Sequence, residues 1–312
     1  MEETISGGRK KKYLRPSINS YMYGNAQAIG NIAKLAGDAA KAKTYFDKAA
    51  DLQEKVHAKL WNVRHTFFET HRVDSSANVR EAIGFMPWYT HMAKDEPRYG
   101  VAWLQAADPQ GFSAPYGQTT AERRHPQFRT HGVGKCEWDG AVWPFATSQT
   151  LTALANYAND YPRCSNLLQT KSTLKPDSLF YAEMEKYMQS QHMRGKPYIG
   201  EYLDETTGYW LKGDQERSRY YNHSTFNDLI ITGLCGLRPH ANQGIEVNPL
   251  LPEGKWSYFC LDNVRYHGHT LTIVYDRDGS RYHVGKGLRI YVDGHLKGQR
   301  SDIGRLIIPD AL

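Results

Sequence analysis

Apolar residues in the amino-terminal part of the chain recur three and four positions apart. Residues 18–35 and 39–60 both follow this spacing, and Gly37 and Asp38 stand between them. Such spacing places the apolar side chains on one face of a helix, and Gly followed by Asp is typical of one helix ending and the next beginning. The pattern therefore predicts an antiparallel helix pair. Further helices are expected over residues 80–92, 97–105, 140–157, 177–191 and 224–236.

The pattern changes after Pro239, where short runs rich in β-forming residues alternate with turn residues. The runs cover residues 244–250, 258–264, 270–275 and 288–292. The pairs Asp278-Gly279 and Asp293-Gly294 are typical of turns between such strands. We therefore expect two domains, a helical one over residues 1–240 and a small β-sandwich over residues 241–312.

Two long stretches between the predicted helices, residues 106–139 and 194–221, are rich in Gly, Pro and aromatic residues. Long irregular loops within a compact domain are usually functional. In the first of them, residues 119–126 offer polar groups for sugar hydroxyls, although an Asp/Glu–Arg network at the surface is the favoured interpretation.

The second stretch contains a carboxylate surrounded by aromatic residues. Its sequence is Gly200-Glu201-Tyr202-Leu203-Asp204-Glu205-Thr206-Thr207-Gly208-Tyr209-Trp210. A glycosidase needs a carboxylate that activates water, aromatic faces for the apolar side of a pyranose, and fixed polar groups for its hydroxyls. The run is also compatible with a simple surface turn, after which Tyr209 and Trp210 re-enter the core.

Two further runs share this aromatic and polar composition. They are Cys136-Glu137-Trp138-Asp139-Gly140-Ala141-Val142-Trp143-Pro144 and Tyr221-Asn222-His223-Ser224-Thr225-Phe226. Three such clusters in one chain favour a sugar site over a set of unrelated turns.

Together the runs resemble the six-hairpin glycosidases, specifically glycoside hydrolase family 63 and the related mannosylglycerate-hydrolase-like domains. In that group a Trp-x-Gly-x-Val-Trp-Pro run lines the sugar pocket, and Trp138, Gly140, Val142, Trp143 and Pro144 match it. A second run carries the catalytic base, and its Glu, Tyr and Thr-Gly are matched by Glu201, Tyr202, Thr207 and Gly208. The resemblance covers roughly residues 1–250 and implies a mostly α fold, an (α/α)6 toroid.

The resemblance also implies a general acid well upstream of the base. Family 63 places it on an Asp within a Gly-Trp-Asp-Asn-Ser-like segment. Aligned on that segment, Glu2 takes the Asp position and Glu3 is its nearest competitor. The alternative interpretation for either residue is a solvated terminus.

We therefore expect an inverting glycoside hydrolase that acts on a glycoside or an oligosaccharide in carbohydrate metabolism, such as polysaccharide degradation. Glu201 is the expected base and Glu2 or Glu3 the expected acid. The residues expected to contact the sugar are Glu137, Trp138, Asp139, Trp143, Tyr202, Trp210 and His223.

The net charge and the cysteine spacing argue against a nucleic-acid-binding protein and against a zinc site. The chain has 39 Lys and Arg against 33 Asp and Glu, which gives a net charge of +6. The basic run Arg9-Lys10-Lys11-Lys12 is too short to form a nucleic-acid-binding face, although it could contact an anionic sugar. The four cysteines show no C-x-x-C spacing and are expected to be buried thiols. His267, His269 and His283 lie on predicted strands, where solvent-facing or hydrogen-bonded histidines are favoured over a metal site. No metal and no cofactor are predicted.

No apolar stretch is long enough to span a bilayer, so membrane insertion is not expected. A soluble protein is predicted, with a periplasmic or secreted location and a homo-oligomeric state both left open. The second functional hypothesis is a carbohydrate-binding protein that kept the pocket but lacks the acid. A third, a helical protein-interaction module, is disfavoured because no period of about 34 residues repeats along the chain.

Overall fold

The computed structural model describes residues 4–7, 12–130, 132–171, 174–221, 225–241, 244–309 and 312. The chain divides into two compact units. Unit 1 comprises residues 1–175 and 182–224, and unit 2 comprises residues 176–181 and 225–312. The expected boundary at residue 240 therefore falls inside unit 2, because residues 225–240 belong to the same compact body as the strands that follow them.

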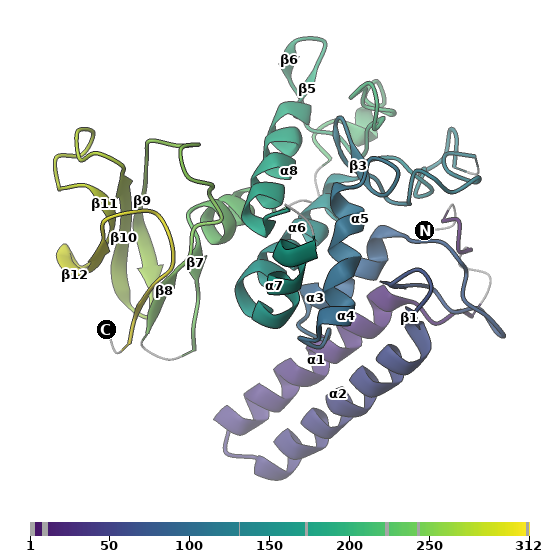
Figure 1. Cartoon of the computed structure of the whole chain (residues 1–312), viewed down its shortest axis with the longest axis horizontal. Helices are drawn as coiled ribbons and strands as arrows, with labels where there is room; N and C mark the ends of the chain where they lie inside the picture. Colours follow the sequence, from purple (N-terminus) through teal and green to yellow (C-terminus); the bar gives the residue numbers. More distant parts are fainter. Residues whose placement is uncertain are drawn as a thin grey trace. The chain divides into compact units, whose positions relative to one another are not determined.

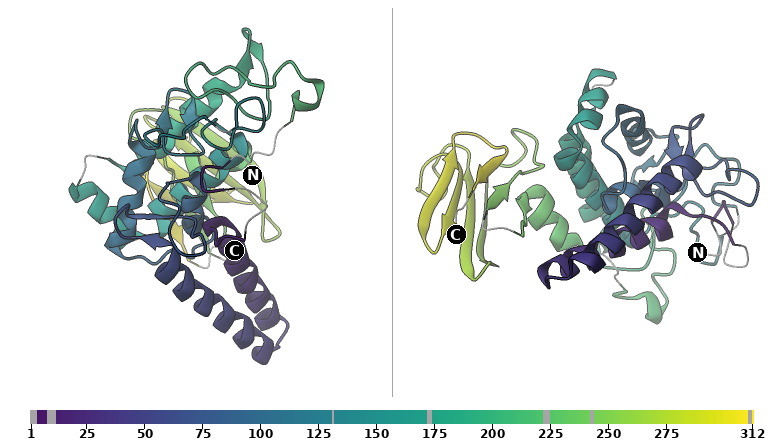
Figure 2. Two further views of the ribbon diagram at one scale, coloured as in Figure 1. Left: turned by 90° about the vertical axis from the view of Figure 1, so that its right-hand side faces the viewer. Right: turned by 90° about the horizontal axis from the view of Figure 1, so that it is seen from below.

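The predicted helix pair at the start of unit 1 is confirmed. Helix α1 (Pro16–Leu35) and helix α2 (Ala39–Leu60) lie side by side (Figures 1 and 2). Gly37 adopts a positive φ of 78°, which favours glycine, and the side chain of Asp38 accepts a hydrogen bond from the backbone N–H of Lys41 at 2.9 Å. The Gly-Asp pair therefore ends the first helix and caps the second.

The middle of unit 1 contains only short helical segments. They are η1 (Ala82–Phe85), α3 (Met86–Tyr89), α4 (Pro97–Gly100), η2 (Val101–Trp103) and α5 (Leu104–Ala107). The last three follow one another without a gap and confirm the helix expected over 97–105. The helix expected over 80–92 is wrong at its start, because Glu81 pairs instead with Ala121 in an antiparallel bridge.

Three longer helices complete unit 1: α6 (Pro144–Asp160), α7 (Pro162–Lys171) and α8 (Pro176–Ser190). The first residues of α8 are counted with unit 2. Helix α6 begins later than position 140 because Val142 pairs with Leu203. Helix α7 was not predicted from the sequence.

Short antiparallel pairs of strands occur in unit 1, one of them before the expected long loops, one within residues 106–139 and one at the start of residues 194–221. These pairs are β1 (Trp61–Asn62) with β2 (Phe67–Phe68), β3 (Ser113–Ala114) with β4 (Gly117–Gln118), and β5 (His192–Met193) with β6 (Lys196–Pro197). A turn of 3-10 helix, η3 (Glu216–Ser218), follows them. Together with the longer strands of unit 2, these pairs make the chain a mixture of helices and strands rather than mostly helical.

Unit 2 contains two antiparallel sheets. One has the strand order β12 (His295–Arg300), β11 (Gly287–Val292), β10 (His269–Asp276), β9 (Tyr258–Tyr266), and the other has the order β13 (Leu306–Ile308), β8 (Ile245–Val247), β7 (Leu237–Arg238). All four predicted strand runs are confirmed. The helix expected over 224–236 is reduced to α9 (Phe226–Leu229) and the π-helical turn η4 (Ile230–Leu234).

Polar side chains of unit 2 fix its turns. Asp276 is 1% exposed and accepts hydrogen bonds from the backbone N–H groups of Gly279, Arg281 and Tyr282 at 3.0, 2.9 and 2.8 Å. The prediction of solvent-facing or hydrogen-bonded histidines is confirmed for all three: His267 contacts the carbonyl oxygen of His240 at 2.8 Å, His269 contacts Asp293 at 2.7 Å, and His283 is exposed.

The cysteines are less uniformly buried than expected. Cys164 and Cys235 are buried, Cys136 is half-buried and Cys260 is exposed. Across the described residues no helix is both long and apolar enough to cross a membrane. The same part of the chain contains no cluster of His, Cys, Asp and Glu able to hold a metal ion.

Candidate active site

Three aromatic rings from two distant loops form one stack. The centroids of Trp138 and Trp143 lie 4.2 Å apart with 18° between their planes, and those of Trp143 and Tyr202 lie 4.8 Å apart with 10° between theirs. Trp143 is 4% exposed and Tyr202 1%, whereas Trp138 is half-buried. Trp143 and Tyr202 therefore support Trp138, which presents the accessible part of the stack.

Backbone pairing holds the two loops together. Val142 and Leu203 exchange two backbone hydrogen bonds, each 3.0 Å long. Arg129 adds charged contacts between the same loops, 2.6 Å to Glu137 and 2.6 Å to Glu205. These contacts fix the position of the segment that carries Glu201 relative to the aromatic stack.

Glu201 lies at the edge of this arrangement and is half-buried. The hydroxyl of Ser218, which is itself 1% exposed, donates a hydrogen bond to Oε2 of Glu201 at 3.2 Å. The pKa of Tyr221 is raised, mainly by burial and next by the negative charge of Glu201. A carboxylate, an orienting hydroxyl and a phenol thus gather beside the stack. The sequence pointed to Tyr221 only as the first residue of an aromatic and polar run, and it gave no signal for Ser218.

The acidic residues on either side of Trp138 are directed into their own loop. Glu137 is 4% exposed and accepts from the backbone N–H of Gly134 at 3.2 Å in addition to its contact with Arg129. Asp139 is fully buried and accepts from the backbone N–H of Gly132 at 2.9 Å. Direct contact of either carboxylate with a sugar would require this loop to open.

The remaining expected site residues divide into two groups. Trp210 is 1% exposed, and its indole N–H donates to the carbonyl oxygens of Ser190 and His192 at 3.2 and 3.1 Å. It therefore packs in the core, as the turn interpretation of its run implies. Glu2, Glu3 and His223 lie outside the described residues.

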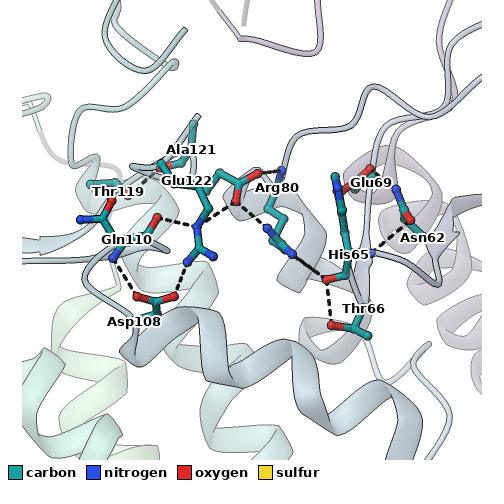
Figure 3. A network of polar contacts seen from close by, with 11 residues as sticks. Asn62, His65, Thr66, Glu69, Arg80, Asp108, Gln110, Thr119, Ala121 and Glu122 are labelled. Atoms are coloured by element: carbon teal, nitrogen blue, oxygen red, sulfur yellow. Dashed lines mark hydrogen bonds and ion pairs between the residues drawn. The ribbon is translucent and has the colours of Figure 1, made fainter. Parts of the chain in front are cut away.

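Within residues 119–126, Thr119, Ala121 and Glu122 belong to the polar network drawn in Figure 3. Arg80 makes an ion pair with Glu122 at 2.6 Å (Figure 3). Arg124 makes ion pairs with both Glu122 and Asp108. The favoured interpretation of this segment as an acidic and basic network is confirmed. The network was expected at the surface, but it is buried, since Glu122 is only 3% exposed.

A second buried carboxylate lies close to the stack. Glu81 is 4% exposed, and one of its oxygens, Oε1, accepts from the backbone N–H of Ser6 at 3.0 Å. Burial raises the pKa of Glu81, while Ser6 and the charges of Arg15 and Arg72 act in the opposite direction. Glu81 shares a small cavity with Trp138. Sequence analysis missed it because it assigned residue 81 to a regular helix.

With this geometry in place, comparison with known proteins identifies the class. Residues 2–224 match the model of the mannosylglycerate hydrolase MGH1-like glycoside hydrolase domain, and residues 237–297 match the glycosyl hydrolase family 65 C-terminal domain. The chain belongs to the MGH1-like glycoside hydrolase domain family. The resemblance stated from the sequence is thereby confirmed.

Solved structures extend the comparison. A structure named "Sialidase" shares 61% sequence identity and a TM-score of 0.95, covering 100% of this chain and 28% of its own. The chain thus spans little more than a quarter of the length of that relative. A family 63 mannosylglycerate hydrolase from Thermus thermophilus has 17% identity and a TM-score of 0.47 over 64% of this chain and 41% of its own. A neutral trehalase from Saccharomyces cerevisiae has 15% identity and a TM-score of 0.44 over 64% of this chain and 36% of its own.

Proposed function

We propose that the protein is an inverting glycoside hydrolase in which Glu201 is the general base. The observation that carries this proposal is the position of Glu201 beside the stack of Trp138, Trp143 and Tyr202, with the hydroxyl of Ser218 donating to its carboxylate at 3.2 Å. A pyranose resting on the accessible part of Trp138 would present its polar edge to the neighbouring groups.

In the inverting mechanism the base deprotonates a water that attacks the anomeric carbon, while a protonated carboxyl on the other face donates its proton to the leaving oxygen. Ser218 would keep the carboxylate of Glu201 directed at that water. We assign the acid to Glu2 or Glu3, which requires a separation of about 6.5–9.5 Å between the carboxyl groups of acid and base.

We further propose that the helical part of the chain is a portion of an (α/α)6 toroid. Membership of the MGH1-like glycoside hydrolase domain family supports this assignment. In such a ring the loops at one end of the helices form the pocket, which agrees with the loop positions of Trp138 and Glu201.

The test is hydrolysis of a panel of 4-nitrophenyl α-glucoside, α-mannoside, α-rhamnoside and α-sialoside. The sialoside is included because the relative with 61% identity is named a sialidase. We expect wild-type turnover of at least one member, loss of activity by at least a hundredfold in Glu201→Gln, and no comparable loss in Glu185→Gln, a matched change of another glutamate. Release of the inverted anomer, followed by NMR, would support the inverting assignment.

Two results would contradict parts of this proposal. Full activity in Glu201→Gln would remove Glu201 from the role of base. Binding of a sugar by the wild type without turnover would instead favour the second hypothesis, a carbohydrate-binding protein without a complete acid and base pair.

A further inference from the structure

The cavity beside Trp138 is small and largely apolar. Its volume is about 30 Å³, and its walls include Tyr21, Met86, Trp138, Phe145 and Gln149 together with Glu81. A space of this size holds one water molecule or one hydroxyl-bearing arm of a larger ligand, and it is too small for a pyranose ring.

The carboxylate of Glu81 is incompletely partnered within this cavity. Oε1 accepts from the backbone N–H of Ser6 at 3.0 Å, and the hydroxyl of Ser6 also acts on the carboxyl, but within the described part of the chain no donor makes a hydrogen bond of normal geometry with Oε2. Leaving a buried polar atom without a partner is costly, and binding sites are a common place for such atoms because the ligand supplies the missing hydrogen bond.

The backbone fixes the direction of Glu81. The backbone N–H of Ala82 donates to the carbonyl oxygen of Thr120 at 2.9 Å. The backbone N–H of Glu122 donates to the carbonyl oxygen of Arg80 at 3.0 Å. Arg80 is held in turn by its 2.6 Å ion pair with Glu122 (Figure 3). Because successive side chains of an extended segment point to opposite sides, anchoring Arg80 in its network directs Glu81 toward the cavity.

The cavity and the proposed base belong to the same aromatic stack. Trp138 forms part of the cavity wall, and Tyr202, at the other end of the stack, is the residue after Glu201. A sugar ring resting on Trp138 would therefore have Glu81 within reach of one of its hydroxyl or hydroxymethyl groups.

We propose that Glu81 is a sugar-binding residue whose Oε2 forms a hydrogen bond with one hydroxyl of the sugar that rests on Trp138, and so determines which sugar is accepted. This inference depends on the proposed function for its ligand class and adds a specificity residue to the same site. A neutral carboxyl can donate to that hydroxyl, and burial, which raises the pKa of Glu81, favours this protonated form.

The test is a coupling experiment with the glycoside that the wild type hydrolyses best and with each of its monodeoxy analogues. In the wild type we expect KM to rise at least tenfold for one deoxy position. In Glu81→Ala we expect KM to rise at least tenfold for the parent glycoside, with no further rise for that same deoxy analogue. Such non-additivity reports a direct contact, which a purely structural role of Glu81 would not produce.

Two further variants keep the result interpretable. Glu81→Gln preserves the side-chain volume and the contact with Ser6, and its amide can still donate a hydrogen bond to the sugar, so this variant is used if Glu81→Ala does not fold. Glu81→Gln should still bind the sugar. Its KM should no longer depend on pH, because the titrating carboxyl that gives the wild type this dependence is gone. The charged groups that act on this titration are Arg15 and Arg72, and Tyr21 is a further titratable group that lines the same cavity. The matched control is Glu183→Gln, another carboxyl that is 2% exposed and has a raised pKa because of burial, but that does not line this cavity. Its KM should change less than twofold.

The failures of the two proposals are separable. If the wild type binds a sugar but hydrolyses none, the hydrolase proposal fails, and the same deoxy series is scored by dissociation constants. If the wild type neither binds nor hydrolyses any member, both proposals fail. If the wild type is active and its Glu81 variants respond to every deoxy analogue as the wild type does, Glu81 contacts only a resident water, and the present inference is overturned.

Discussion

Arg80 and Glu81 are neighbours in the sequence, but their side chains enter two different kinds of buried environment. On one side, Arg80 pairs with Glu122 at 2.6 Å and its guanidinium also donates to the carbonyl oxygen of His65 at 3.0 and 3.1 Å (Figure 3). On the other side, Glu81 has one oxygen without a donor in the described part of the chain and a raised pKa. Both carboxylates are more than nine-tenths buried.

The different surroundings of Arg80 and Glu81 illustrate how one short pairing of extended segments, that of Glu81 with Ala121, can place one side chain in a stabilising network and the next in a proposed binding site. A buried charge with a partner and satisfied hydrogen bonds fixes the backbone, whereas a buried carboxyl with an unmet hydrogen bond carries a free-energy cost that a ligand can relieve. The network around Glu122 is therefore expected to govern folding, and Glu81 is expected to govern binding.

The largest effect should come from removing the positive charge of the network. Arg80→Met removes the closer cationic partner of Glu122, leaves only Arg124 at 3.5 Å, and removes the donors to the carbonyl oxygen of His65, so the free energy of unfolding should fall by about 3–5 kcal/mol. Urea denaturation followed by circular dichroism measures this change. The control is Lys43→Met, which breaks a pair with Asp47 whose side chains are 77% and 63% exposed and should cost less than about 0.5 kcal/mol. Equal losses in the two variants would contradict the comparison.

Glu81→Gln should change the pH dependence of stability. The folded-state pKa of Glu81 is raised above its ordinary value of 4.5, so above that pH the folded state keeps a proton that the unfolded state has lost. Wild-type stability should therefore fall, relative to the variant, as pH rises from about 4.5 toward the folded pKa, by up to about 1.4 kcal/mol per pH unit. Urea midpoints measured from pH 4 to pH 8 test this expectation. Parallel curves for the two proteins would contradict the raised pKa.

A smaller effect is expected at Ser218, where a single hydrogen bond orients the proposed base. Ser218→Ala removes the donor that lies 3.2 Å from Glu201, so kcat should fall about tenfold while KM stays within about twofold. Steady-state kinetics on the preferred glycoside give both values. Ser190→Ala offers a control of the same type, because the hydroxyl of Ser190 is also buried but donates to the backbone carbonyl oxygen of Tyr187 at 2.7 Å. An unchanged kcat would indicate that Glu201 does not depend on this hydroxyl.

Much of the architecture could be read from local patterns. The helices on either side of Gly37 and Asp38 were predicted because their apolar spacing and the turn residues agree, and the strand runs of unit 2 were predicted from β-rich segments separated by turns. The aromatic run around Trp138 and the carboxylate at Glu201 were predicted as parts of a sugar site because a sugar site combines such residue types, and their roles stay predictions.

The arrangement of the site depended on contacts between residues distant in the sequence. Glu81 was assigned to a helix, since its pairing with Ala121 leaves no local signal, and Trp210 was expected to face the sugar although it packs in the core. Whether a carboxylate is neutralised, as Glu122 is, or left with an unmet hydrogen bond, as Glu81 is, follows from partners brought close only by folding. The sequence by itself determined the local elements and the kind of chemistry, because periodicity and residue type are local. The tertiary structure decided which of those residues are buried, paired and directed toward a common site.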